Sequence, residues 1–195
     1  MMPDERVQVT NFEIKVKSIR VGWEDLELIF DQIIIPFEAS YIGSEPISTL
    51  VESIFNLENH LDFNIEDYFA KWHWNDEPGK IRFEVKRSST TDVLTIDIVL
   101  DKYDNGSDIK QWHFKMPYVL YRNIVIKTAL CQLKRYGIKG FHENWMADDF
   151  TELPTMLIVI LSSETKRLSE DPNSAERFSD ILGEIELLKQ ALQNC

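Results

Sequence analysis

The sequence has little of the material that common catalytic and metal-binding motifs require. Its 195 residues include only two cysteines and seven glycines. The cysteines, Cys131 and Cys195, are too few for a disulfide framework or a zinc site. The few glycines leave little for a phosphate-cradling loop, and no Walker, GxGxxG, GxSxG or HExxH motif occurs. We therefore expect no metal and no cofactor, and the common routes to catalysis are missing.

Long apolar runs are also absent. The two most apolar stretches, LELIFDQIIIPF and LPTMLIVILSS, are far shorter than the ~20 residues that a membrane-spanning helix needs. The first residues, MMPDERVQVTNF, contain no apolar segment of the kind found in secretory signals. We expect a cytoplasmic protein that does not bind membranes.

Basic residues are outnumbered, with 21 lysines and arginines against 33 acidic residues and a formal net charge of -12. Nucleic acids bind through faces rich in lysine and arginine, so we do not expect them as partners. The same charge attracts a basic protein, although solubility alone also explains it. The hydrophobic fraction of 44% is ample for a core. We predict one α+β domain over residues 1–170 and a C-terminal amphipathic helix over 171–195.

The hydrophobic pattern predicts a largely antiparallel sheet with helices packed on one face. Alternation predicts a strand over 7–19 and one longer extended stretch over 26–41, in which Pro36 marks an edge or a bulge. Helical spacing predicts a helix over about 45–58. Its cap would be Ser44, and its apolar face would include Phe55.

The stretch from residue 68 to residue 116 alternates most regularly and predicts a four-stranded meander. Glu-Pro-Gly at 77–79 and Asn-Gly at 105–106 supply turn chemistry, in which glycine tolerates a positive φ. The pattern after the meander predicts three helices and a loop. These are a helix from Pro117 to Gly137, a loop over 138–150, a buried helix within 151–168 and an amphipathic helix over about 174–193.

Two histidines, His73 and His113, are the candidates for catalysis. Each lies between two aromatic residues of a predicted strand, so burial of those rings turns the histidine to the wet face. On one sheet the two could converge, with a carboxylate of the same face as a further ligand. A hydrolase or metal-dependent enzyme is therefore one hypothesis. Structural histidines on a tryptophan-rich hairpin explain the pattern better, so no catalytic or metal-binding residue is assigned.

A non-enzymatic protein-binding module is the first hypothesis. In the predicted meander, Glu84, Asp97 and Asp101 alternate with apolar residues and therefore point outward. These carboxylates could face a basic protein partner.

The C-terminal helix carries an apolar stripe whose members step by three and four residues. Two heptads are too short for a free-standing coiled coil. The stripe therefore docks on its own domain, which we favour, or it forms a homodimer seam or binds a partner helix. A self-assembling structural protein is accordingly the third hypothesis. The stripe consists of Phe178, Ile181, Ile185, Leu188 and Leu192.

The stretch FEASYIGSEPISTLVESIFNL followed by WNDEPGKIRFEV resembles a loosely defined set of small bacterial proteins. Some of these resemble immunity proteins of polymorphic toxin systems, which bind and neutralise a cognate toxin. The resemblance covers roughly residues 37–103 and implies an immunity-like binding role. The N-terminal strands and the C-terminal helices of this chain depart from the pattern. The family offers no catalytic pattern, so no site residue is transferred.

Overall fold

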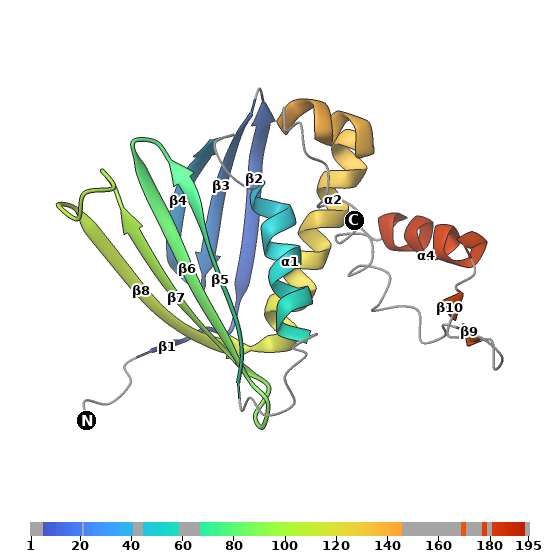
Figure 1. The fold of residues 1–195 in the computed structure, drawn as a ribbon, viewed down its shortest axis with the longest axis horizontal. Coiled ribbons are helices and arrows are strands. Elements are labelled where there is room, and N and C mark those ends of the chain that lie inside the picture. Colours follow the sequence, from blue (N-terminus) through green and yellow to red (C-terminus); the bar gives the residue numbers. More distant parts are fainter. Residues whose placement is uncertain are drawn as a thin grey trace.

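The computed structural model describes residues 6–20, 22–40, 45–58, 67–145, 169–170, 177–178 and 181–193. Within these ranges the chain forms two main β-sheets, a short pair of strands and three helices (Figure 1). The expected α+β class, with a largely antiparallel sheet and a C-terminal helix, is confirmed.

The two main sheets have three and five strands. The first has the order β2 (Phe12–Arg20), β3 (Trp23–Phe30), β4 (Ile33–Ser40). The second has the order β1 (Val7–Gln8), β8 (Ile109–Pro117), β7 (Val93–Asp101), β6 (Gly79–Ser88), β5 (Asp67–Asp76). Only the β1–β8 pair of these sheets is parallel. The remaining elements are α1 (Pro46–Glu58), α2 (Tyr118–Trp145), β9 (Ser169–Glu170), β10 (Arg177–Phe178) and α4 (Ile181–Gln193).

The extended stretch expected over 26–41 is a hairpin, so the expectation of one long strand is wrong. β3 and β4 pair antiparallel across a tight turn at Asp31, whose φ is 52°. The Asp31 carboxylate accepts the backbone N–H groups of Thr10 and Asn11, which ties the turn to the chain before β2. An aspartate tolerates this left-handed backbone better than most residues. Pro36 lies on β4, an edge strand of its sheet, as expected.

The four-stranded meander expected between residues 68 and 116 is present as β5 to β8. Trp74 is fully buried on its inner face and Trp72 is half-buried beside it. The Asn-Gly signal falls in the loop after β7, where Gly106 has a φ of 76°. The two tryptophans of β5 therefore pack toward the core, as the alternation predicts.

The core lies between the inner faces of the two sheets, where aromatic rings meet. The ring centroids of Phe30 and Phe114 are 4.0 Å apart, and those of Phe12 and Phe30 are 4.9 Å apart. Phe37 of β4 stacks on Trp74 of β5 at 4.9 Å. Each such pair contributes about 0.5–1.5 kcal/mol beyond the burial of its area. These stacks fix one sheet against the other.

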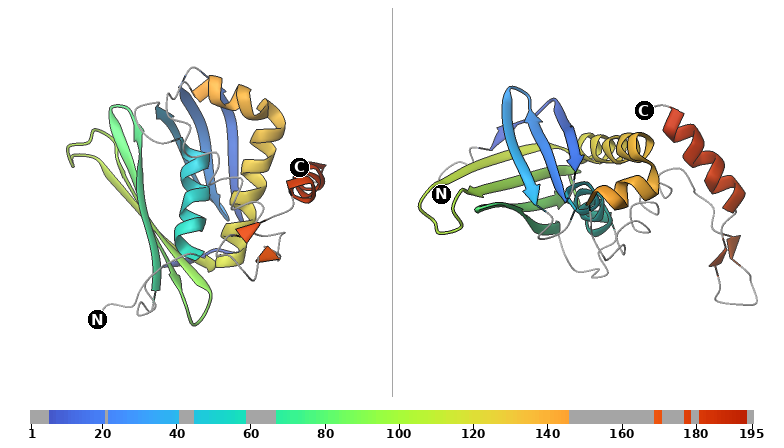
Figure 2. Two further views of the ribbon diagram at one scale, coloured as in Figure 1. Left: turned by 45° about the vertical axis from the view of Figure 1, so that its right-hand side comes forward. Right: turned by 90° about the horizontal axis from the view of Figure 1, so that it is seen from above.

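Helices α1 and α2 cover the side of the core that the sheets leave open (Figures 1 and 2). α1 packs against β5, α2 packs against β2, and the helices contact each other. Phe55 was expected on the buried face of α1 but is exposed, because it lies at the margin of the apolar stripe. The buried apolar side chains of α1 are Ile47, Leu50, Val51, Ile54 and Leu57.

Helix α1 begins at a carboxylate cap. The two side-chain oxygens of Glu45 accept the backbone N–H groups of Ile47, at 2.8 Å, and of Ser48. A negative group at this end satisfies free N–H donors and interacts favourably with the helix dipole. Ser44, the expected cap, lies outside the described residues.

A second carboxyl lies beside this cap. Glu24 of β3 is fully buried, and its burial, with the charge of Glu45 as the second cause, holds its pKa well above the usual range. Glu24 therefore keeps its proton to a higher pH than an exposed glutamate does.

Helix α2 follows β8 without a loop and is interrupted at Gly137, whose φ is 68° and ψ is 167°. The helix was expected to end at this glycine, and the structure has an interruption of the helix there. The helix then resumes and runs to Trp145, so the loop expected from residue 138 is wrong as far as residue 145. Residues 146–150 and the helix expected within 151–168 lie outside the described residues.

Helix α4 begins at Ile181, later than the expected start near residue 174. Residues 177–178 pair instead with residues 169–170 as strands. In Figure 1 the helix lies beside α2, with which it makes contact. In the described part of the chain, no helix is long and apolar enough to cross a membrane.

Gly79 opens β6 at a point where the chain leaves no room for a side chain. A Cβ there would meet the backbone oxygens of Asp101 and Lys102, whereas its φ is not positive. Close approach, not the expected positive φ, therefore requires this glycine.

We expect Gly79→Ala to lower the free energy of unfolding by about 2 kcal/mol, which urea unfolding measures.

Gly140→Ala is the matched control, because a Cβ there meets Tyr136 at 3.8 Å, an ordinary contact. This variant should be neutral or more stable by up to ~1 kcal/mol, since alanine favours the helix. Equal stabilities of the two variants would contradict the steric explanation.

The raised pKa of Glu24 predicts that the protein becomes less stable as the pH rises. Folded Glu24 binds its proton more tightly than unfolded Glu24, so above the usual value of 4.5 unfolding releases a proton. We expect Glu24→Gln to remove part of the fall in melting temperature between about pH 5 and pH 8. Thermal unfolding of both proteins at several pH values measures this change in melting temperature. Glu52→Gln, on the exposed side of α1, is the control and should keep the wild-type dependence.

Candidate functional site

The side of the five-stranded sheet that points away from the core carries a dense set of polar residues. Because side chains alternate along each strand, the register of β5 to β8 places them together. We call this surface the outer face. Its central residues are Lys71, His73, Lys80, Arg82, Glu84, Lys86, Asp97, Val99, Asp101, Gln111, His113 and Lys115.

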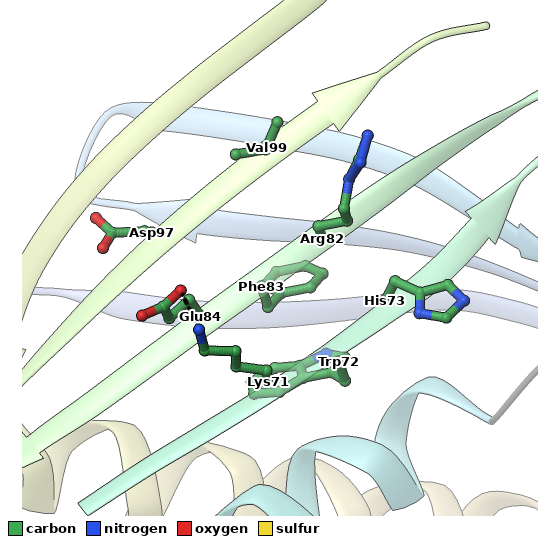
Figure 3. A pocket seen from close by; sticks show the side chains of 8 residues that line it. All are labelled: Lys71, Trp72, His73, Arg82, Phe83, Glu84, Asp97 and Val99. Carbon is green, nitrogen blue, oxygen red and sulfur yellow. Dashed lines mark ion pairs between the residues drawn. The ribbon is translucent and has the colours of Figure 1, made fainter. Parts of the chain in front are cut away.

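A hollow of about 430 Å³ lies on the outer face over β5, β6 and β7 (Figure 3). Trp72 and Phe83 form part of its lining, but their side chains belong to the inner face and stack at 5.0 Å. The floor of the hollow is therefore backed by packed core. The outer-face residues that line it are Lys71, His73, Arg82, Glu84, Asp97 and Val99.

Both candidate histidines lie exposed on the outer face, as expected, but they do not meet. In the strand register, His73 of β5 lies opposite Arg82 of β6, and His113 of β8 lies opposite Asp97 of β7. Strands β6 and β7 therefore separate the two histidines. At ~4.8 Å per strand, their backbones are at least ~14 Å apart. Metal–nitrogen bonds are only ~2 Å long, so the pair cannot share one ion. The described residues contain no group of three histidine, cysteine or acidic side chains that could hold a metal.

His113 is held by Asp97 of the neighbouring strand. Its Nδ1 lies 2.7 Å from Asp97 Oδ1, and Arg6 donates to the other carboxylate oxygen at 3.3 Å. Burial alone would raise the pKa of Asp97, but His113 and Arg6 outweigh it and hold the pKa below its usual value. The pair fixes the imidazole ring and leaves its other nitrogen able to hydrogen-bond a ligand.

Glu84 points outward as expected, but two lysines share its carboxylate. Lys71 Nζ lies 2.9 Å from one oxygen and Lys86 Nζ lies 3.2 Å from the other. Lys71 contributes most to holding the pKa of Glu84 below its usual value, against the opposing effect of burial. The charge of Glu84 is therefore already matched within the outer face.

Asp101 was expected to point outward into solvent and is instead buried, with only 3% of the residue exposed. The loop after β7 returns over it, so that Gly106 N–H and Arg82 Nη2 each donate to one of its oxygens at 3.1 Å. Burial would raise its pKa, but Arg82 and the backbone N–H groups outweigh it and lower the pKa. The expectation of an exposed carboxylate fails because this loop contact is not visible in the strand pattern.

The cations of this surface were not among the residues expected to form a site. Lys71 and Arg82 line the hollow, and Arg6 reaches Asp97 from a position 91 residues away in the chain. Alternation already placed Arg82 outward, so counting basic residues on the predicted wet face would have found part of this signal. The contribution of Arg6 depends on the parallel β1–β8 pair, which no local pattern indicates.

Comparison of this chain with protein-family models, with curated proteins and with solved structures gives no match.

The residues expected to form a C-terminal seam are divided between two elements. Phe178 lies in β10, so it is not part of the helical stripe. Leu188 and Leu192 are partly buried against the main core, whereas Ile185 is 42% exposed. The homodimer seam stays a prediction, and Ile185 is the residue that tests it.

We expect Ile185→Glu to leave the mass in solution unchanged and to alter stability by less than ~0.5 kcal/mol, as exposed positions do. Light scattering coupled to size-exclusion chromatography measures the mass. Leu188→Glu is the control and should lower stability by about 1–3 kcal/mol, because its side chain contacts the core. A wild-type dimer that Ile185→Glu dissociates would establish the seam instead.

Proposed function

We propose that this chain is a non-enzymatic protein-binding module and that the outer face of the five-stranded sheet is its binding surface. The observation that carries the proposal is the charged hollow over β5 to β7, on which no described element packs. Binding sites are typically concave and pre-formed, with a few polar groups at fixed positions.

The size and rigidity of the outer face suit a protein partner. Four strands of about nine residues give a surface on the order of 600 Å², from the strand spacing and the rise per residue. One side of a standard interface buries ~800 Å². Behind the hollow, Trp72, Trp74 and Phe83 pack against one another, so little ordering is required when a partner binds.

The immunity-like role that the resemblance implies is the narrower form of this proposal. All outer-face residues that line the hollow lie between Lys71 and Val99, inside the stretch that carries the resemblance. The partner would then be a toxin that the outer face covers. Neutralisation by covering needs affinity alone and no catalytic group, which agrees with the scarcity of catalytic motifs.

The enzyme alternative is the weaker candidate. It requires His73 and His113 to act together, and the register sets them on strands that are not neighbours. The His113–Asp97 pair alone could orient a general base. His113 does not line the hollow, however, where a ligand would be held.

Peptide selection on the full chain tests the binding surface. A random-peptide library is panned on the immobilised protein, and each recovered peptide is then measured against two variants. Val99→Trp fills the hollow without changing charge. Ile34→Trp makes a comparable change at a 55% exposed position of the three-stranded sheet. We expect most recovered peptides to lose about tenfold in affinity for Val99→Trp and to keep their affinity for Ile34→Trp.

Circular dichroism and thermal unfolding confirm that both variants are folded. Peptides that are insensitive to Val99→Trp, or sensitive to Ile34→Trp instead, would show that the outer face is not the preferred binding surface.

A further inference from the structure

We infer that the segment recognised by the outer face is acidic and extended, with a carboxylate seated in the hollow between Lys71, His73 and Arg82. This inference rests on the proposed binding role of the outer face and names its partner chemistry. It reverses the expectation of a basic partner, which assumed that the carboxylates of the meander are free.

The outer face is cationic on a chain whose formal net charge is -12. Five basic side chains of β5 to β8 lie on it, and Arg6 joins them through its contact with Asp97. Among the described side chains of these strands, three carboxylates face the same way, at Glu84, Asp97 and Asp101, and Asp104 of the loop after β7 adds a fourth through its ion pair with Lys80 at 2.7 Å. The five basic side chains are Lys71, Lys80, Arg82, Lys86 and Lys115.

Each of those carboxylates already interacts with a basic side chain or with N–H donors. Glu84 lies between two lysines, and Asp97 lies between Arg6 and His113. Asp101 accepts hydrogen bonds from Arg82 and from the backbone N–H group of Gly106. Among the described side chains, these carboxylates are therefore matched by positive charge. Lys71, Lys80 and Arg82 are also paired, each with one carboxylate, but their several N–H donors leave capacity for a further acceptor.

Arg82 shows this capacity most clearly. A guanidinium has five N–H donors, and the side chain of Arg82 is 48% exposed although one nitrogen is bound to Asp101. In Figure 3, Arg82, His73 and Lys71 lie around the hollow together with Glu84, Asp97 and Val99, and the Lys71 amine is turned to Glu84. A carboxylate placed there meets two permanent positive charges and an imidazole, and charge-assisted hydrogen bonds of this kind are the strong ones. The two acids of the lining, Glu84 and Asp97, are held by Lys71 and Lys86 and by Arg6 and His113, which reduces their repulsion of the ligand.

The three-stranded sheet shows the opposite balance. Among the side chains that the structure describes there, its strands place four acidic groups against two lysines on the surface away from the core. An acidic segment is therefore repelled by this surface and attracted by the outer face, which orients the encounter. The acidic residues are Glu13, Asp25, Glu27 and Glu38, and the lysines are Lys15 and Lys17.

The spacing of the cations favours an extended segment. Lys80 and Arg82 lie two residues apart on β6, which corresponds to ~6.8 Å along a strand. Alternate side chains of an extended chain have the same spacing. A segment that carries glutamate or aspartate at every second position can therefore place one carboxylate at Arg82 and the next near Lys80, whose amine would be shared with Asp104.

A nucleic acid also carries regularly spaced negative charges, but the structure favours carboxylates. Binding to nucleic acid requires a broad basic surface that releases counterions, and this chain is strongly acidic outside one face. Its tryptophans at Trp72 and Trp74 pack inward and offer no stacking platform.

Three probes of equal length test the inference on the full chain by NMR titration. They are a peptide of alternating glutamate and serine, a peptide of alternating lysine and serine, and an oligothymidylate. We expect the acidic peptide to bind most tightly and to shift the signals of Lys71, His73 and Arg82. Binding should weaken when salt rises from about 0.01 M to about 0.15 M, since the Debye length falls from ~30 Å to ~8 Å.

Two charge reversals of equal size supply the matched control. Lys71→Glu should weaken the acidic peptide about tenfold, whereas Lys15→Glu should weaken it far less. Both lysines are at least half exposed, at 59% and 51% of their side chains, so both variants should fold. Tighter binding of the lysine peptide or of the oligothymidylate, or equal effects of the two reversals, would overturn the inference.

The two tests fail in different ways. If the peptides selected by panning depend on Val99 but are not acidic, the outer face binds protein and only the acidic chemistry is wrong. If they do not depend on Val99, the binding surface itself is wrong.

Discussion

A stack of aromatic rings between the two sheets determines much of what the surface shows. Phe30 of the three-stranded sheet and Phe114 of β8 are in direct ring contact, so Phe114 must point inward. Because strand residues alternate, His113 must then point outward, and the register carries that constraint from β8 across to β5. A slip of one residue would exchange the buried rings with the charged side chains. The charge pattern of the outer face thus follows from the packing of the opposite face.

The pairing of charges on that face follows from the same register. Lys71, Glu84, Asp97 and His113 lie in one row across four strands, which sets a base beside an acid at each end and two acids in the middle. Lys86 and Arg6 supply positive charge to the two central carboxylates from neighbouring positions. Such a row has little net attraction for a cation, and the proposed acidic partner is based in part on this balance.

The local hydrophobic periodicity of the sequence predicted the elements and the side-chain directions that depend on neighbouring residues alone. It placed the meander, turned Trp74 inward and His73 outward, and found α1 almost to its ends. It missed the hairpin at Asp31 because the turn contains neither glycine nor proline, and it misplaced Asp101 because a loop folds back over it. For the candidate site, alternation says which side chains share a face. It does not say which of them pair, since these contacts join residues far apart in the chain.

The parallel strand β1 and the ring contact of Phe30 also bear on how the chain folds as it is made. Both find their counterparts on β8. Phe37 can meet Trp74 of β5 earlier, but Phe30 has no partner ring on the five-stranded sheet until Phe114 has been synthesised. At ~5–20 residues per second, the ~80 residues between Phe30 and Phe114 take roughly 4–16 s. During that interval part of the apolar face of β2 to β4 lacks its native cover, and transiently exposed apolar surface of this kind is prone to aggregation.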